Sequence, residues 1–275
     1  MGSGTARETG VAARSRQRDD WFDGAPRRLH GDARVAAVRL FGSLARGDAD
    51  ELSDVDMFVA FGDGSDGKLD RVDAWLGELG ELSRWREDPN NAPDGGRYIE
   101  AVYPADLLPL IVDSYWQPIR CAALAADTRV VFDRVGLPHA PPGITTYGLI
   151  PSVRDRLAFV APDDPVVRLR EQAAALWSDL AIVAKDQARR LGHADEEAAA
   201  LWSVLDQVAA DAAVALDRRC PPGGLQGLAA ELDRVLATAG LEGVDAAARA
   251  NAYAWLHVCE ALRDESWVDG PGGVG

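Results

Sequence analysis

Two aspartates spaced two residues apart, Asp54 and Asp56, are the part of the sequence best suited to chemistry. They stand in the string Ser53-Asp54-Val55-Asp56, at the start of an apolar run that ends at residue 61. Residues two apart on a β-strand project from the same face, so a strand here would bring both carboxylates together and turn Val55 toward the core. Adjacent carboxylates repel unless they are solvated or bridged by a divalent cation, and Mg²⁺ prefers oxygen ligands. The spacing predicts a metal site.

A glycine and a serine precede this pair, at the end of an earlier apolar run over residues 34–41. Gly42 permits a tight backbone turn, and Ser43 offers a hydroxyl and an amide to a phosphate oxygen. Arg46 adds a charged donor three residues later. Gly42, Ser43 and Arg46 are therefore predicted to bind the phosphates of a nucleotide.

The combined pattern resembles the polymerase-β-like nucleotidyltransferase superfamily, in which a Gly-Ser turn is followed by Asp-x-Asp at the opening of a strand. The resemblance implies that Asp54, Asp56 and a third carboxylate hold two Mg²⁺ ions. It also implies that ATP or another NTP is the co-substrate and that an acceptor hydroxyl attacks its α-phosphorus.

Asp113 is the predicted third carboxylate, and Glu100 competes with it for that place. Asp113 lies in Leu-Pro-Leu-Ile-Val-Asp-Ser-Tyr, where a charge within so apolar a run requires a partner or a metal. Ser114 and Tyr115 follow it in place of the apolar residue usual in this family. Glu100, in Arg-Tyr-Ile-Glu-Ala-Val, is the alternative third ligand or the general base.

Two further segments resemble antibiotic-modifying members of the superfamily, notably the aminoglycoside 6-adenylyltransferase type. Leu176-Trp177 and the following Ala-Ile-Val-Ala-Lys185 are similar to a helix whose lysine approaches the triphosphate, and Lys185 is one of only two lysines in the chain. Residues 129–136 resemble the strand and turn that close the catalytic domain. Lys185 is accordingly predicted to bind the nucleotide.

The elements that would position these residues form two groups. Short β-like runs at residues 34–41, 55–61, 98–103, 108–115 and 129–132 surround one stretch with helical spacing, residues 69–83. After residue 165 the apolar positions step by three and four, which predicts helices around residues 169–183, 201–215, 225–236 and 251–262. The pattern predicts an α+β fold, a mixed β-sheet domain with flanking helices followed by an all-α helical bundle.

The composition and net charge of the chain limit the kinds of molecule that it is expected to bind. The chain has 275 residues, with 44 Asp and Glu against 29 Lys and Arg, a formal net charge of −15. This charge repels the phosphate backbone of nucleic acids and attracts small cations. The three cysteines are scattered, and we expect a cytoplasmic protein without a membrane segment or secretion signal.

Three regions are expected: a disordered tail over residues 1–19, a catalytic domain over 20–150 and a helical domain over 151–275. The predicted activity is transfer of a nucleoside monophosphate, AMP by preference, to a hydroxyl of a small cationic molecule of the aminoglycoside or lincosamide type. The alternatives are a protein AMP-transferase of the antitoxin type and a catalytically silent nucleotide-binding module. The acceptor, the preferred base and the choice between monomer and homodimer stay open.

Overall fold

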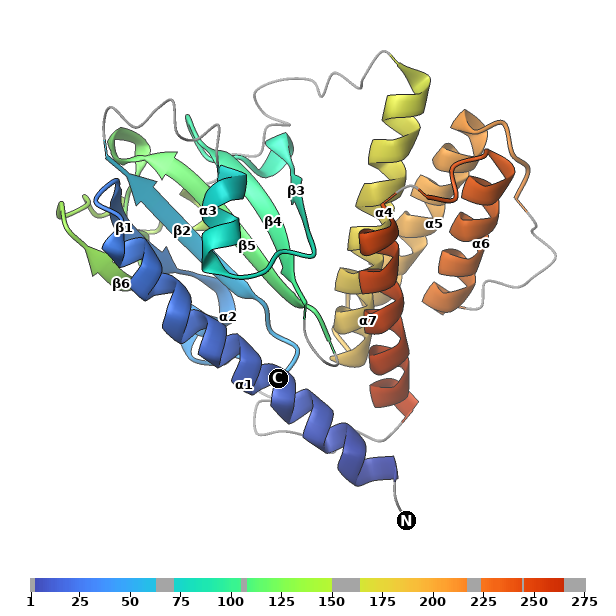
Figure 1. Ribbon diagram of the computed structural model, residues 1–275, viewed down its shortest axis with the longest axis horizontal. Coiled ribbons are helices and arrows are strands. Elements are labelled where there is room, and N and C mark those ends of the chain that lie inside the picture. The colour runs from blue at the N-terminus through green and yellow to red at the C-terminus, as the bar shows by residue number, and fades with distance from the viewer. Residues whose placement is uncertain are drawn as a thin grey trace. The chain divides into compact units, whose positions relative to one another are not determined.

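The computed structural model describes residues 3–62, 72–104, 108–149, 164–216, 224–243 and 245–264. The chain divides into two compact units, Met1–Val160 and Ala161–Gly275, and each is described here by itself (Figure 1). The predicted domain boundary, between residues 150 and 151, falls outside the described residues.

The first unit is built on a six-stranded sheet with strand order β3-β4-β5-β2-β1-β6. Its strands are β1 (Val35–Leu40), β2 (Val55–Phe61), β3 (Arg84–Glu87), β4 (Arg97–Tyr103), β5 (Leu110–Pro118) and β6 (Arg129–Asp133). Strands β2 and β5 run parallel, whereas the other neighbours run antiparallel. The predicted mixed sheet is confirmed.

One face of this sheet is buried beneath two helices, α1 (Ser3–Gly31) and α3 (Val72–Leu79) (Figure 1). Alternate residues of β2, from Val55 to Phe61, enter one apolar core with Ala25 and Leu29 of α1 and with Leu76 of α3. Because side chains alternate along a strand, Asp56 must project from the opposite face. Covering one face with helices therefore leaves the other face for the candidate site.

Helix α1 replaces the disordered tail expected over residues 1–19, because the helix already begins at Ser3. Arg14 and Arg18, within that expected tail, have buried side chains. The spacing of Trp21, Ala25 and Leu29 in the following turns is helical, and it was the available sign of this element.

The structure also differs from the predictions at the edge of the sheet. Helix α3 ends at Leu79, and the chain then forms strand β3, which no sequence pattern had indicated. Strand β3 has few apolar residues because it lies at the sheet edge and is paired only with β4. Strands β4 and β5, both expected from the sequence, pair antiparallel, and residues 105–107 of their connection lie outside the described residues.

The second unit contains the four predicted helices, α4 (Pro165–Ala188), α5 (Ala194–Asp211), α6 (Gly224–Thr238) and α7 (Ala246–Asp264). Asp164 caps α4, because its side chain accepts hydrogen bonds from the amides of Val166 and Val167 at 2.8 and 3.3 Å. Helix α4 packs against α5 and α7. Apolar stripes such as Leu228, Leu232 and Val235 of α6 supply the buried face.

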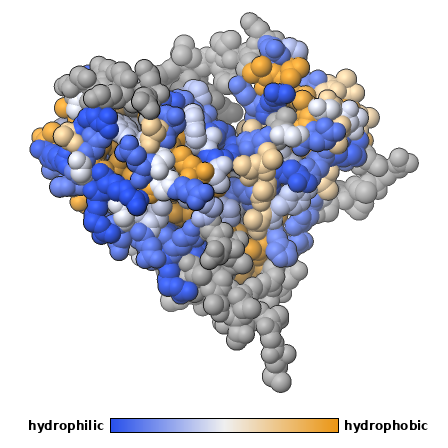
Figure 2. All heavy atoms as spheres, in the orientation of Figure 1, coloured by the Kyte–Doolittle hydropathy of each residue, from blue (hydrophilic) through white to orange (hydrophobic). Residues whose placement is uncertain are grey.

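The remaining described elements are short. They are α2 (Gly42–Arg46) and three single turns of 3₁₀ helix, η2 (Pro89–Asn91), η3 (Ile119–Cys121) and η4 (Tyr147–Leu149). On the face drawn in Figure 2, hydrophilic residues predominate and apolar residues occur in small groups. Among the described residues, no helix combines the length and apolarity needed to cross a membrane.

Candidate active site

The strand register brings three predicted acidic residues into one row. Asp56 on β2 is the register partner of Asp113 on the parallel strand β5, and Asp113 is in turn the partner of Glu100 on β4. Register partners project from the same face of a sheet, and neighbouring strands are about 4.8 Å apart. Asp113 is therefore adjacent to Asp56, whereas Glu100 is one strand further away.

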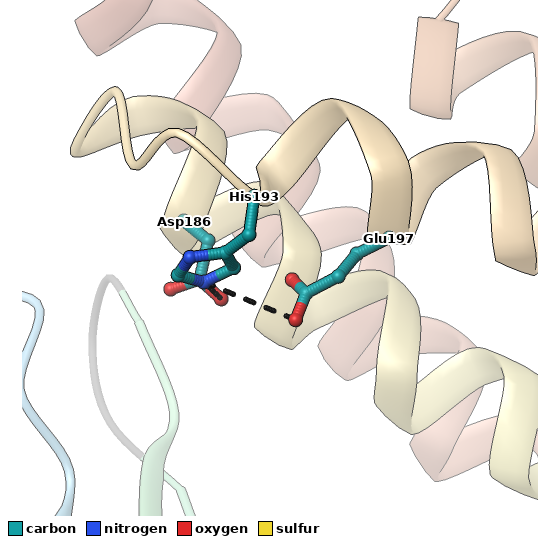
Figure 3. A group of neighbouring side chains, drawn as sticks. All are labelled: Asp186, His193 and Glu197. Atoms are coloured by element: carbon teal, nitrogen blue, oxygen red, sulfur yellow. Dashed lines mark ion pairs between the residues drawn. The ribbon is translucent and has the colours of Figure 1, made fainter.

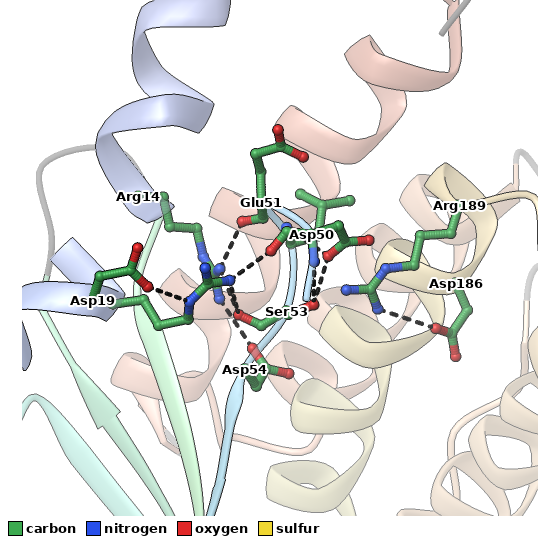
Figure 4. A network of polar contacts seen from close by, with 10 residues as sticks. Arg14, Asp19, Asp50, Glu51, Ser53, Asp54, Asp186 and Arg189 are labelled. Atoms are coloured by element: carbon green, nitrogen blue, oxygen red, sulfur yellow. Dashed lines mark hydrogen bonds and ion pairs between the residues drawn. The ribbon is translucent and has the colours of Figure 1, made fainter. Parts of the chain in front are cut away.

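Asp54 directly precedes β2 and is fixed by an arginine from α1. Arg14 Nη2 lies 3.0 Å from Asp54 Oδ1, and the two side chains are 0% and 16% exposed. The same guanidinium binds main-chain oxygens of the loop before β2 (Figure 4). The carboxylate at the entry to β2 thus has a defined position.

Gly42 lies against Asp56 where β1 turns into α2. Its φ is +65°, and a Cβ atom placed on it would stand only 2.3 Å from Asp56 Oδ2. The amide of Phe41 donates to the main-chain oxygen of Asp56 at 3.2 Å, which ties the end of β1 to the start of β2. A glycine is required here both by the positive φ and by the closeness of the carboxylate.

The surroundings of Asp113 strongly affect its ionisation. Burial, followed by the negative charges of Asp56, Glu100 and Asp54, raises the pKa of Asp113 well above its usual range. The hydroxyl of Tyr98 donates to Asp113 Oδ1 at 2.7 Å, which opposes that rise. So much negative charge on one face fits a divalent cation, because a cation would stabilise the ionised carboxylates.

Glu100 is engaged by arginines of the edge strand. Its Oε1 lies 3.0 Å from Arg84 Nη1 and its Oε2 lies 3.3 Å from Arg86 Nη2, and its side chain is only 4% exposed. Both oxygens thus accept hydrogen bonds from guanidinium groups. These contacts favour a role in charge balance over the predicted roles of metal ligand or general base.

The predicted phosphate-binding residues are divided between the two units. Ser43 is half-buried in α2, and exposed Arg46 forms an ion pair with Asp48 at 3.0 Å. Lys185 belongs to the helical unit, where it is buried and its Nζ lies 5.2 Å from the ring centroid of Trp255. The assignment of Lys185 to the nucleotide stays a prediction.

Four buried aromatic side chains share the sheet face with the carboxylates: Phe41, Phe58, Tyr98 and Tyr115. The rings of Phe58 and Tyr115 stack with centroids 4.8 Å apart. Arg39 lies over Phe58 at 4.2 Å, and burial lowers its pKa to about 10. The four aromatic side chains reduce solvent screening beside the acidic row. The electrostatic interactions among the carboxylates of that row are therefore stronger.

In the helical unit, the described residues Asp186, His193 and Glu197 have possible metal-ligand atoms within 4.8 Å of one another (Figure 3). His193 Nε2 lies 3.8 Å from Asp186 Oδ2 and 3.9 Å from Glu197 Oε1. Arg189 already pairs with Asp186 at 3.9 Å, and the group borders the N-terminus of α5, where the helix dipole opposes a cation. We therefore assign no metal to it.

Residues 25–104 match the family model described as a nucleotidyltransferase domain. The chain thus contains a nucleotidyltransferase domain of the polymerase-β-like kind. The matched stretch includes Asp54, Asp56 and Gly42, whereas Asp113 and Lys185 lie beyond it. Such domains generally use an NTP and a divalent metal ion. No match was found among curated proteins.

Several residues that shape this site carried no signal in the sequence. Arg14 contacts Asp54, Tyr98 contacts Asp113, and Arg84 pairs with Glu100. Arg14 lies 40 residues from its partner in the chain. Spacing rules concern neighbours within a few residues, so such contacts become visible only after folding.

Proposed function

We propose that this chain transfers a nucleoside monophosphate, AMP by preference, from an NTP to a hydroxyl of a small cationic molecule and releases pyrophosphate. The acceptor we propose is an antibiotic of the aminoglycoside or lincosamide type. The observation that carries the proposal is the register pairing of Asp56 with Asp113 on neighbouring strands, with Asp54 directly before β2, within and beside a nucleotidyltransferase domain.

These three carboxylates would hold two Mg²⁺ ions. Asp56 and Asp113 are register partners, and Asp54 precedes Asp56 by two residues, so all three can supply oxygens to a shared pair of hard cations. When bound, such ions lower the pKa of an attacking hydroxyl and neutralise charge on the departing pyrophosphate. Asp113 is preferred to Glu100 as the third ligand because it is the register partner of Asp56, whereas Glu100 lies one strand further away and has both carboxylate oxygens engaged by arginines.

The turn after β1 would receive the phosphates. Gly42 brings the main chain close to Asp56, and Ser43 follows with its hydroxyl and amide. Arg46 is exposed and can supply a charged donor, and Lys185 is proposed as a further contact. These residues bind and orient the nucleotide, so that the α-phosphorus faces the acceptor hydroxyl. We assign no residue as general base.

The acidic balance of the chain supports a cationic acceptor. A formal net charge of −15 attracts molecules that carry ammonium groups and disfavours the ends of RNA or DNA. Several ammonium groups on one small molecule would be attracted by this net negative charge. An aminoglycoside has this charge and offers several hydroxyls.

Mass spectrometry tests the proposal directly. The protein is incubated with Mg²⁺, each NTP in turn, and a pool of aminoglycosides and lincosamides, in parallel with proteins from a bacterial lysate. We expect a nucleoside monophosphate adduct on a small molecule and its loss when EDTA is added. An adduct confined to a protein would support the AMP-transferase alternative, and nucleotide binding without any adduct would support the silent module.

Asp56→Asn provides the site control. It should abolish the adduct while circular dichroism stays unchanged, because it removes a carboxylate without changing side-chain size. Asp73→Asn is the matched control, since Asp73 is exposed on α3, on the other side of the sheet. An active Asp56→Asn enzyme would refute the metal assignment.

A further inference from the structure

Helix α1 places two buried arginines one turn apart against the loop that enters β2. The side chains of Arg14 and Arg18 are 0% and 7% exposed. Residues four apart share one face of a helix, so both guanidinium groups reach the same segment, residues 50–54. Fully buried arginines are rare unless their charges are paired and hydrogen-bonded.

Arg14 holds both the main chain and the side chain at the start of β2. Its Nη1 donates to the main-chain oxygens of Glu51 and Ser53 at 2.8 and 2.9 Å, and its Nη2 donates to Asp54 Oδ1 at 3.0 Å (Figure 4). A planar guanidinium fixes the directions of its donors. The carboxylate of Asp54 is thereby oriented relative to its own backbone.

Arg18 holds the same loop one turn further along α1. Its Nη1 donates to the main-chain oxygen of Asp50 at 2.5 Å. The side chain of Asp50 in turn accepts from the amide of Leu52 at 3.0 Å and from the hydroxyl of Ser53 at 2.7 Å. The loop is therefore fixed by its own hydrogen bonds and by both arginines.

We propose that Arg14, supported by Arg18, is a positioning residue that sets the orientation of Asp54 for divalent metal binding. This inference rests on the proposed function, which makes Asp54 a metal ligand. Arg14 acts through Asp54 and the loop rather than on a reacting atom. Its positive charge also offsets part of the repulsion among Asp54, Asp56 and Asp113, so the carboxylates can stay close before a metal arrives.

Arg14→Lys tests the inference because it keeps the charge and removes the planar fork. A lysine ammonium is a single point donor group and cannot reproduce the donor directions toward all three oxygens. Arg16→Lys is the matched control, since Arg16 is an exposed arginine of the same helix. Circular dichroism and thermal unfolding establish that both variants fold.

Three readouts follow, and two of them need no turnover. In the metal-free protein, the amides of Leu52 and Ser53 should exchange hydrogen roughly tenfold faster in Arg14→Lys. Mn²⁺ binding measured by calorimetry should weaken about tenfold, because one charge-assisted hydrogen bond orients the ligand. The kcat should fall by about tenfold or more, with a smaller change in KM for the NTP, whereas Arg16→Lys should match wild type.

Wild-type exchange and Mn²⁺ affinity in a folded Arg14→Lys protein would overturn the inference. If Arg14→Lys does not fold, Arg18→Lys decides by the same two measurements, because Arg18 holds the loop through Asp50. Suppose that the wild-type protein transfers no nucleotide, but that Arg14→Lys still speeds amide exchange and weakens Mn²⁺ binding. The proposed function then fails and the positioning role stands. If the wild-type protein is active and Arg14→Lys equals it in every readout, the proposed function stands and the positioning role fails.

Discussion

We expect Gly42→Ala to lower the activity of the candidate site much more than it lowers the stability of the fold. The added methyl carbon would stand 2.3 Å from Asp56 Oδ2, so the carboxylate must retreat by about 1 Å to reach ordinary contact. The far end of an aspartate can rotate cheaply, so the clash costs little folding free energy. The positive φ of +65° adds about 1–2 kcal/mol of strain for alanine.

The effect on catalysis should be much larger than the effect on stability. A displacement of about 1 Å in a catalytic group can cost on the order of a hundredfold in rate. We therefore expect Gly42→Ala to lose about 1–2 kcal/mol in the free energy of unfolding and roughly a hundredfold in kcat. Urea unfolding and steady-state nucleotide transfer measure the two quantities on the same preparation.

Gly47→Ala is the matched control for this prediction. Gly47 also has a positive φ, +81°, but a Cβ atom there would meet no described atom within 4 Å. Its alanine variant should show the same loss of stability and keep the kcat of wild type. A Gly42→Ala enzyme with wild-type kcat, or an equal loss of kcat in both variants, would refute the steric reasoning.

Two further predictions concern stability. Asp133 accepts hydrogen bonds from the amides of residues 135–137 at 2.7–2.9 Å, which outweigh the effect of burial and lower its pKa. Its contribution to stability is present above the usual pKa of 3.8 and is lost as pH falls through the lower folded value. Because two of the three hydrogen bonds are exposed to solvent, Asp133→Asn should cost no more than about 1 kcal/mol at pH 7 and progressively less in acid unfolding series. A cost independent of pH would contradict this assignment. Arg84→Met should destabilise the protein by about 3 kcal/mol because Glu100 loses a buried partner, and adding Glu100→Gln should recover part of that loss. Additive effects in this double-mutant cycle, measured by urea unfolding, would show that the pair does not interact.

Local patterns in the sequence identified the parts of the site that lie close together in the chain. The alternation around Val55 placed Asp54 and Asp56 on one side of a strand, and β2 begins at Val55 as predicted. Steps of three and four residues identified the helices of the second unit. These features depend on the geometry of a single strand or helix, which neighbouring residues determine.

The tertiary structure decided which distant residues meet. The sequence favoured Asp113 over Glu100 as the third carboxylate but left Glu100 as an alternative. The sheet order made Asp113 the register partner of Asp56, while arginines of β3 paired with Glu100. Helix α1 and its Arg14 went unrecognised because a charged, Gly-containing segment has no helical stripe of its own before residue 21. Its arginines are buried because the loop before β2 offers them main-chain oxygens and a carboxylate. Strand pairing and the burial of paired charges bring together residues that are far apart in the chain. Local spacing could therefore suggest the chemistry of this candidate site, but only the folded chain shows which distant residues lie there.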